Sequence, residues 1–333
     1  MEPPGLWGTA DPALISWLNA NQTPAFAQLT TPAVGAVLPH VQRPMVHATG
    51  TTAIPHHAAG LTFAGVPTGL AVLRQQHQGP SPGLTVLSLA IAPQWRGLGL
   101  ARQLMQWLRH EAWSLGWDRL SLSYPLANAS TAAMERLTDP AEGWQHSPGL
   151  RLVQVERAGA TELFEQLTPL VRFAQRSGRW ALEPWGQLPL QLRHSVGAEL
   201  EAPQWLWPCG NRADDPLQTL DLTISTLLRD QGQPAGWLTA HRIGPSQCRV
   251  SQWWVHPRLQ GSGAAVLLMH RALEAGLPVA QGYTVASFGM DPSNTAAIRL
   301  CEQKLEPLAT TVCRQRRALI TAASDHFNAA TRF

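Results

Sequence analysis

The stretch IAPQWRGLGLARQLMQWL, residues 91–108, places two glycines between an apolar run and a helical pattern. Pro93 ends the preceding strand, because a proline cannot donate to a central ladder. Apolar residues at Leu104 and Leu108 predict a helix directly after the glycines. A glycine loop that opens a helix leaves several backbone N–H groups unpaired at the helix start. Those groups, together with the helix dipole, predict a binding site for a phosphate or pyrophosphate.

A second stretch, VHPRLQGSGAAVLLMHRAL at residues 255–273, repeats the same arrangement of strand end, glycine loop and helix start 164 residues later. Two further patterns recur in the same order, at spacings of 167 and 166 residues. The recurring patterns are P-x-x-x-G-x-G from Pro93 and Pro257, G-x-P-x-G from Gly65 and Gly232, and short helical segments from Asn128 and Asn294. Three patterns at nearly one spacing indicate that the chain contains two copies of one unit.

Each copy has the same predicted order of elements: a hairpin, a strand, the glycine loop, a helix, a strand and a short helix. The hairpin of each copy pairs antiparallel strands, whereas a strand, crossover helix and strand imply parallel neighbours. The predicted fold class is therefore α/β (α+β), with a mixed, largely antiparallel twisted sheet flanked by helices in each copy. We expect domains at residues 1–155 and 156–333. Residues 1–60 are interpreted as a degenerate start of the unit, and residues 16–29 as helical. Residues 150–171 either end the first copy and open the second, or belong to the second altogether.

Composition excludes several classes of protein. A chain of 333 residues with 44% apolar residues suits two globular domains. It has no apolar run long enough to span a membrane and no signal peptide, so we expect a cytoplasmic location and no membrane partner. The four cysteines form no C-x-x-C pair, so we expect free thiols. His56 and His57 have no Cys or carboxylate nearby at the spacing of a metal site, so we expect a loop there and no bound metal. A net charge of +3, with Arg314, Arg316 and Arg317 as the local basic cluster, gives no evidence of a nucleic-acid partner, and oligomeric state stays open.

Two common phosphate loops do not fit the glycine pattern. The dinucleotide fingerprint needs a third glycine where the copies have Arg102 and Val266, and neither copy ends in the Gly-Lys-Ser/Thr of a Walker loop. What remains is Q/R-x-x-G-x-G, from Gln94 and from Arg258. With this motif, and with NTAAIRLCEQKL from residue 294, the chain resembles the GCN5-related N-acetyltransferase (GNAT) family, as two tandem domains.

The resemblance implies acetyl-coenzyme A, or another acyl-coenzyme A, as the cofactor. It implies backbone contacts to the pantetheine arm and loop contacts to the pyrophosphate in both copies. By position these residues are Leu89, Ala90, Ile91, Gln94, Trp95, Arg96, Gly97, Leu98, Gly99 and Leu100 in the first copy, and Trp253, Trp254, Val255, Arg258, Leu259, Gln260, Gly261, Ser262, Gly263, Ala264 and Asn294 in the second.

The sequence offers candidates for the proton donor and for the base of the reaction. Where the family often has a proton-donating Tyr, the second copy has Cys301 and the first has Glu135. A thiol can return a proton to the leaving thiolate, so Cys301 is a catalytic candidate, with a small buried apolar residue as the alternative. Tyr124 on the preceding strand is a substitute donor for the first copy. No strand carboxylate is available as a base, which leaves water relayed from His256 or Gln252, or a backbone carbonyl, with His256 as the named candidate.

The resemblance therefore implies an acetyl-coenzyme A-dependent N-acetyltransferase that acts on a small-molecule or peptide amine. The second copy is the preferred active one, because both of its motifs match the family. The alternative is a noncatalytic acyl-coenzyme A-binding protein, and transfer to a hydroxyl or of a longer acyl chain stays open. The Pro- and Trp-rich residues 184–216, with Trp205 and Trp207, are expected to form a wall of the acceptor pocket.

Overall fold

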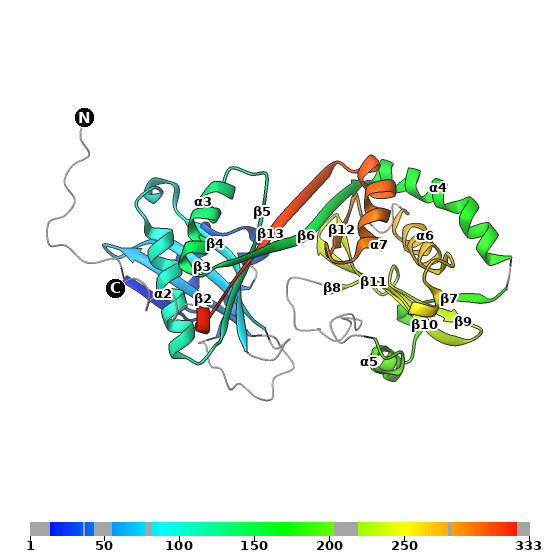
Figure 1. Ribbon diagram of the computed structural model, residues 1–333, viewed down its shortest axis with the longest axis horizontal. Helices are drawn as coiled ribbons and strands as arrows, with labels where there is room; N and C mark the ends of the chain where they lie inside the picture. The colour runs from blue at the N-terminus through cyan, green and yellow to red at the C-terminus, as the bar shows by residue number, and fades with distance from the viewer. Residues whose placement is uncertain are drawn as a thin grey trace. The chain divides into compact units, whose positions relative to one another are not determined.

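The computed structural model describes residues 14–35, 37–42, 55–76, 82–176, 178–202, 219–278 and 282–324. Its contacts divide the chain into two compact units. Unit 1 comprises residues 1–147 together with 316–333, and unit 2 comprises residues 148–315. Each unit contains a mixed sheet flanked by helices (Figure 1), which confirms the predicted fold class.

Unit 1 is built on the strand order β1-β2-β3-β4-β5-β13. Its strands are β1 (Leu14–Leu18), β2 (His56–Phe63), β3 (Val66–Gln76), β4 (Gly83–Ile91), β5 (Arg119–Pro125) and the second half of β13 (Thr311–Thr321). Its helices are η1 (Thr23–Leu29), α1 (Pro32–Gly35), η2 (Leu38–His40), η3 (Pro93–Trp95), α2 (Leu100–Ser114), α3 (Thr131–Leu137) and η4 (Pro140–Glu142). β4 and β5 pair in parallel, as expected for strands joined by a crossover helix.

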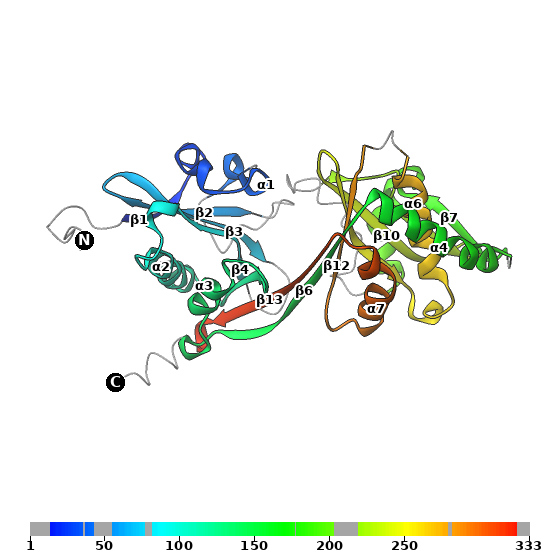
Figure 2. The same ribbon diagram turned by 90° about the horizontal axis from the view of Figure 1, so that it is seen from above.

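Both faces of the unit 1 sheet are covered. On one face α2 and α3 bury apolar side chains such as Leu104 and Leu108 against β4 and β5. On the other face η1 and η2 bury Phe26 and Leu38 against β2 and β3, and Figure 2 shows the two layers on either side of the sheet. The sheet is therefore buried on both sides, so the ends of its strands are left for binding.

Two sequence-based expectations for unit 1 are wrong. Residues 16–18 were expected to be helical, but they belong to β1, which pairs with β2 from Leu18 opposite Ala58. Strand pairing thus overrides the local helical pattern. His56 and His57 were expected in a loop, but they open β2 and are buried.

The end of β13 completes unit 1. Ala318 and Ile320 are 0% and 1% exposed and belong to the same apolar core as Leu122 on β5. The backbone N–H of Ala322 donates to the carbonyl of Asp118 at 3.0 Å, which fixes the strand beside the start of β5. The structure thus groups residues 316–333 with the first copy, whereas the sequence led us to expect a single division after residue 155.

Unit 2 repeats the plan of unit 1. Its strands are β6 (Gln145–Glu156), β7 (Trp180–Pro184), β8 (Thr219–Leu220), β9 (Thr226–Asp230), β10 (Gln233–Gly244), β11 (Gln247–Val255), β12 (Val285–Met290) and the first half of β13. Its helices are α4 (Arg157–Gln175), η5 (Trp185–Gln187), α5 (Leu190–Glu199), η8 (Pro257–Leu259), α6 (Ala264–Gly276), α7 (Thr295–Leu300), the π-helical η10 (Cys301–Leu305) and η11 (Glu306–Leu308). Because α2 and α6 begin at residues 100 and 264, the structure confirms the repeat spacing of 164 found in the sequence.

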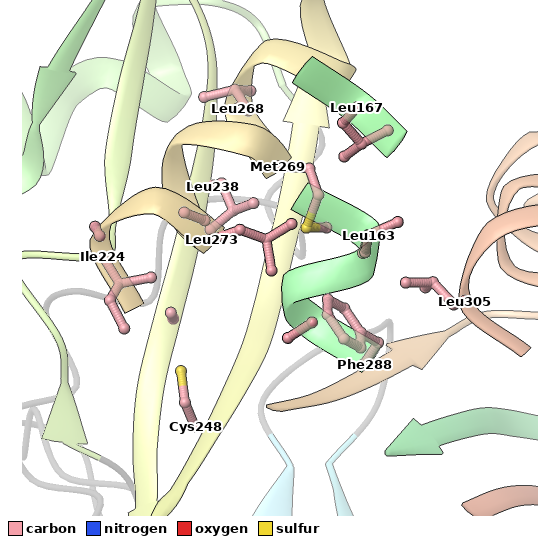
Figure 3. Packing of buried hydrophobic residues seen from close by; sticks show 14 of the residues in the cluster. Leu163, Leu167, Ile224, Leu238, Cys248, Leu268, Met269, Leu273, Phe288 and Leu305 are labelled. Carbon is pink, nitrogen blue, oxygen red and sulfur yellow. The ribbon is translucent and has the colours of Figure 1, made fainter. Parts of the chain in front are cut away.

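The main core of unit 2 lies between its sheet and the helices α4 and α6. Figure 3 shows Leu163 and Leu167 of α4 beside Met269 and Leu273 of α6, with Phe288 of β12 beneath them. The opposite face carries a second core of tryptophans and α5 residues. None of the described helices is long and apolar enough to cross a membrane.

Candidate functional site: a strand cleft and glycine loop in each unit

In unit 1, β4 and β5 separate halfway along their length. Their parallel ladder runs from Gly83 opposite Arg119 to Val86 opposite Leu122. Leu87 then forms a bulge, because β3 pairs with Val86 and Ser88 at consecutive positions. From there β4 continues to Ile91, and no residue of β5 within the described ranges pairs with it. The edge of β4 at residues 89–91 therefore has no strand of the described ranges beside it and can offer backbone groups to a ligand, apart from the Ile91 carbonyl, which accepts from Arg96 at 3.0 Å.

The glycine loop of unit 1 lies directly after this edge. Gly97 and Gly99 have φ angles of 83° and 76°, a left-handed conformation that glycine adopts without strain. Gly99 is the N-cap of the 15-residue helix α2, where no side chain caps the first N–H groups. A Cβ atom added at either glycine would meet nothing within 4 Å, so the space above the loop is open. The loop thus has the geometry of an anion site at a helix N-terminus.

The strand edge, the loop and α3 enclose a cavity of about 700 Å³. Its lining contains eight of the ten residues predicted as cofactor contacts in this copy, and it adds residues of α3 that the sequence did not indicate. The lining residues are Leu89, Ala90, Ile91, Trp95, Arg96, Gly97, Gly99, Leu100, Ala101, Arg102, Ala129, Ser130, Ala133, Met134, Arg136 and Leu137. A cavity of this volume is in the range of small-molecule and cofactor sites.

Unit 2 has the same backbone framework. β11 and β12 pair in parallel only from Gln247 to Val250, Ser251 forms the bulge, and Gly261 and Gly263 have φ angles of 78° and 89°. A small space of about 10 Å³ lies near the Trp253 end of β11, lined by residues of α4, α6 and η10 rather than by the glycine loop. The backbone framework is therefore present in both copies, and the cavity of about 700 Å³ lies beside the loop of unit 1.

Trp253 lies on β11 beyond the point where β11 and β12 have separated. Its counterpart in unit 1, 164 residues earlier, is Leu89. The Trp253 indole N–H donates to the carbonyl of Ala265 in the first turn of α6 at 3.1 Å. Its ring lines the small remaining space together with Val266 and Leu300. The indole thus bridges the strand and the helix between which a pantetheine arm would otherwise pass.

Two further features surround the glycine loop of unit 2. Helix α4 approaches it, so that a Cβ atom at Gly263 would lie 3.9 Å from Cβ of Ala174. The Arg258 guanidinium, a predicted cofactor contact, lies 3.7 Å from the carboxylate of Asp230. Asp230 is buried and also binds Arg179, whose hydrogen bonds lower the pKa of that carboxyl. The Arg258 guanidinium is therefore already engaged by a carboxylate, which makes it less available to a phosphate at this loop.

Two other predicted contacts of unit 2, Asn294 and Trp254, have structural partners. Asn294 caps α7, since its side-chain oxygen accepts from the N–H of Ala297 at 3.0 Å. Trp254 stacks on Trp237, with ring centroids 4.6 Å apart, in the core on the opposite face of the sheet. Trp185, from the expected pocket wall, belongs to the same core, and Trp205 and Trp207 lie outside the described residues.

The two catalytic candidates of unit 2, Cys301 and His256, both have structural roles. Cys301 is 0% exposed in the unit 2 core, and burial raises the pKa of its thiol to about 11. Such a thiol is a weaker acid than a free cysteine and has no path to solvent. His256 accepts from the N–H of Arg258 through Nδ1 at 3.3 Å and so caps the turn η8.

Unit 1 places different groups at the corresponding positions. Glu135, the counterpart of Cys301, forms an ion pair of 2.6 Å with Arg316 of β13. The Tyr124 hydroxyl is buried and lies 3.4 Å from the hydroxyl of Thr138, which in turn contacts His146 at 3.0 Å. Neither Glu135 nor Tyr124 is among the residues that line the cavity.

Comparisons with known proteins agree with this architecture. The model of the acetyltransferase (GNAT) family matches residues 38–139 and 195–306, more than half of the chain. A tandem GNAT protein from the clavulanic acid biosynthesis pathway, solved without acetyl-coenzyme A, has a TM-score of 0.65 at 16% identity, covering 93% of this chain and 99% of the other. A GCN5-related N-acetyltransferase from Sphaerobacter thermophilus has a TM-score of 0.59 at 14% identity, covering 93% and 95%. A search of curated protein sequences finds no match.

Proposed function

Because the chain belongs to the acetyltransferase (GNAT) family, we propose that it is an acetyl-coenzyme A-dependent N-acetyltransferase that holds its cofactor in unit 1. The observation that carries the proposal is the cavity of about 700 Å³ between the free edge of β4, the glycine loop and α3. The pantetheine arm would lie along Leu89, Ala90 and Ile91, and the pyrophosphate at the N–H groups that open α2.

This assignment to unit 1 differs from the preference for the second copy drawn from the sequence. The motifs of unit 2 match the family more fully, but motif residues can keep their structural roles after a ligand site is lost. In unit 2 the Trp253 indole is hydrogen-bonded to the first turn of α6, and Arg258 of the loop is already paired with Asp230. We therefore expect one acyl-coenzyme A per chain.

The proposed reaction transfers the acetyl group from sulfur to nitrogen. An amine in its neutral form attacks the thioester carbon, the C–S bond breaks, and coenzyme A leaves as a thiolate that takes up the proton released by the amine. Backbone N–H groups at the free edge of β4 can polarise the carbonyl oxygen during attack. The acceptor is an amine of a small molecule or peptide, and a cytoplasmic location goes with this cofactor.

A noncatalytic acyl-coenzyme A-binding role is the second candidate. It is favoured by the ion pair between Glu135 and Arg316, because this pair occupies the position of the proton-donating Tyr of the family. Release of free thiol from acetyl-coenzyme A with a panel of amines separates the two. Binding without thiol release from any amine would support the noncatalytic role.

Matched variants of the two helix starts test the location of the cofactor. Ala101→Glu and Ala265→Glu each place a carboxylate at an equivalent, half-buried position in the first turn of α2 or α6. Acidic residues there favour the helix itself but repel a bound phosphate, so folding should be kept. Calorimetric titration with acetyl-coenzyme A should give one site in the wild type, no binding in Ala101→Glu and unchanged binding in Ala265→Glu. Two sites, or loss only in Ala265→Glu, would contradict the assignment to unit 1.

A further inference from the structure

Three arginines are among the residues that line the cavity of unit 1, and they come from three different elements. Arg96 lies in the glycine loop, Arg102 in the first turn of α2, and Arg136 in the last turn of α3. The residues that line this cavity include no Asp or Glu. The cavity therefore has a surplus of positive charge that a neutral pantetheine arm does not require.

Most donors of these groups remain available to a ligand. Arg96 donates one N–H to the carbonyl of Ile91 at 3.0 Å. Arg102 donates one N–H to the carbonyl of Arg136 at 3.4 Å, which brings the side chain of Arg102 to the end of α3. A guanidinium has five N–H donors, so these bonds leave most of them unused.

The nearest carboxylate is shared with a further cation. Glu142 lies 3.7 Å from Arg102, through Oε1, and 3.6 Å from Arg109, through Oε2. Both contacts are long for a hydrogen-bonded ion pair. One carboxylate between two arginines leaves the rim of the cavity positively charged.

The arginines are not a general feature of the repeated unit. At the equivalent positions unit 2 has Gln260, Val266 and Glu302. The glycines and the helix start, by contrast, are present in both units. The positive charge thus accompanies the open cavity and not the fold, which indicates a role in ligand binding.

The number of charges points to a ligand with more than a pyrophosphate. The glycine loop and the N-terminus of α2 already suit a pyrophosphate. Arg102 and Arg136 lie where α2 and α3 approach each other, and guanidinium groups match the oxygens of a phosphate monoester, which carries about two charges at neutral pH. Coenzyme A has such a group, the 3′-phosphate of its ribose, whereas pantetheine on a carrier protein has a single phosphodiester and no nucleotide.

We propose that Arg102 and Arg136 bind the 3′-phosphate of the nucleotide, so that unit 1 selects coenzyme A thioesters over dephospho-coenzyme A and over carrier-bound pantetheine. The inference rests on the proposed function, because it deepens the assignment of the cofactor to unit 1. Arg96, which is tied to the β4 edge, would instead face the pyrophosphate.

Calorimetric titration of the full chain with coenzyme A and with dephospho-coenzyme A tests the proposal. The wild type should bind coenzyme A at least about tenfold more tightly, the effect of one or two charge-assisted hydrogen bonds at a partly exposed site. Arg102→Gln and Arg136→Gln should each weaken coenzyme A binding about tenfold and change dephospho-coenzyme A binding less than about threefold. Arg172→Gln, at the exposed end of α4, removes the same charge from unit 2 and should change neither affinity.

A second measurement needs no variant and guards against misfolding. Adenosine 3′,5′-bisphosphate should compete with coenzyme A for the wild-type protein more strongly than adenosine 5′-phosphate does. Equal affinity of the wild type for coenzyme A and dephospho-coenzyme A would overturn the inference, as would an equal loss of both affinities in the arginine variants. Either of these outcomes leaves the proposed function standing, whereas a wild type that binds no coenzyme A overturns both.

Discussion

Replacement of Ile320 by Ala in the last strand should destabilise unit 1 and leave unit 2 intact. The Ile320 side chain is 1% exposed and lies in the core formed by α2, β4 and β5. Truncation of a buried Ile to Ala removes apolar contacts and leaves a cavity, at a cost of 2–5 kcal/mol, and we expect about 3 kcal/mol at this fully buried position. That loss corresponds to roughly a hundredfold rise in the population of open unit 1.

Hydrogen exchange followed by mass spectrometry resolves the two units, which a single unfolding curve would not. Exchange should accelerate about a hundredfold in the slowest peptides of β4 and β5, with little change in β10 and β11. Val312→Ala is the control, since this residue of the same strand is 43% exposed and should change stability by less than about 0.5 kcal/mol. Equal acceleration in both units, or an effect no larger than that of Val312→Ala, would refute the assignment of the last strand to unit 1.

Two further predictions concern buried titratable groups. Burial lowers the pKa of His57 below 6.5, so the unfolded chain takes up a proton first as the pH falls through about 6.5, and unit 1 should lose stability from there down to the lower folded pKa. Urea unfolding at pH 8 and pH 5.5 measures this loss, which should be smaller in His57→Gln than in the wild type. The control His40→Gln, at an exposed position, should lose as much stability as the wild type. Equal losses in all three proteins would exclude His57 as the source. Cys301→Ala should keep acetyl transfer within about twofold and lower stability by about 1 kcal/mol, because the thiol lies in the core of unit 2. A severalfold loss of acetyl transfer in a variant that is fully folded under the assay conditions would restore a catalytic role to Cys301.

The glycine loop and the helix after it could be predicted from the sequence, because this backbone depends on a few residues with special geometry. Gly97 and Gly99 adopt left-handed conformations that other residues rarely adopt, so their pattern could be recognised in both copies. The repeat spacing then predicted the same loop at Gly261 and Gly263, and the family comparison agrees with it.

The state of each cleft could not be predicted in the same way. Trp253 belongs to an apolar strand in which core packing and ligand contact give the same pattern. The two copies differ at this position, since the second has Trp253 where the first has Leu89. Whether such an indole lies in the cleft depends on its orientation, which the sequence does not specify. Arg102 and Arg136 lie on two separate helices, so their approach is a tertiary property.

The partner of the last strand was also beyond the sequence. β13 buries Ala318 and Ile320 on either side of the half-buried Leu319, a period-two pattern that suits the edge of either unit equally. The error at residues 16–18 has a similar origin, because pairing with β2 decides the conformation of a short segment.

The position of the last strand in unit 1 also affects how the protein is made. Translation proceeds from the N-terminus, so unit 1 lacks the side chains of Ala318 and Ile320 until the whole of unit 2 has been synthesised. At about 5–20 residues per second, β5 waits on the order of ten seconds or more for this neighbour. During that interval the edge of β5 is open to pairing with other nascent chains, and unit 2, although later in the sequence, can complete its core almost as soon as unit 1 does. A gene fragment that ends after the first copy would therefore encode a sheet without its last strand.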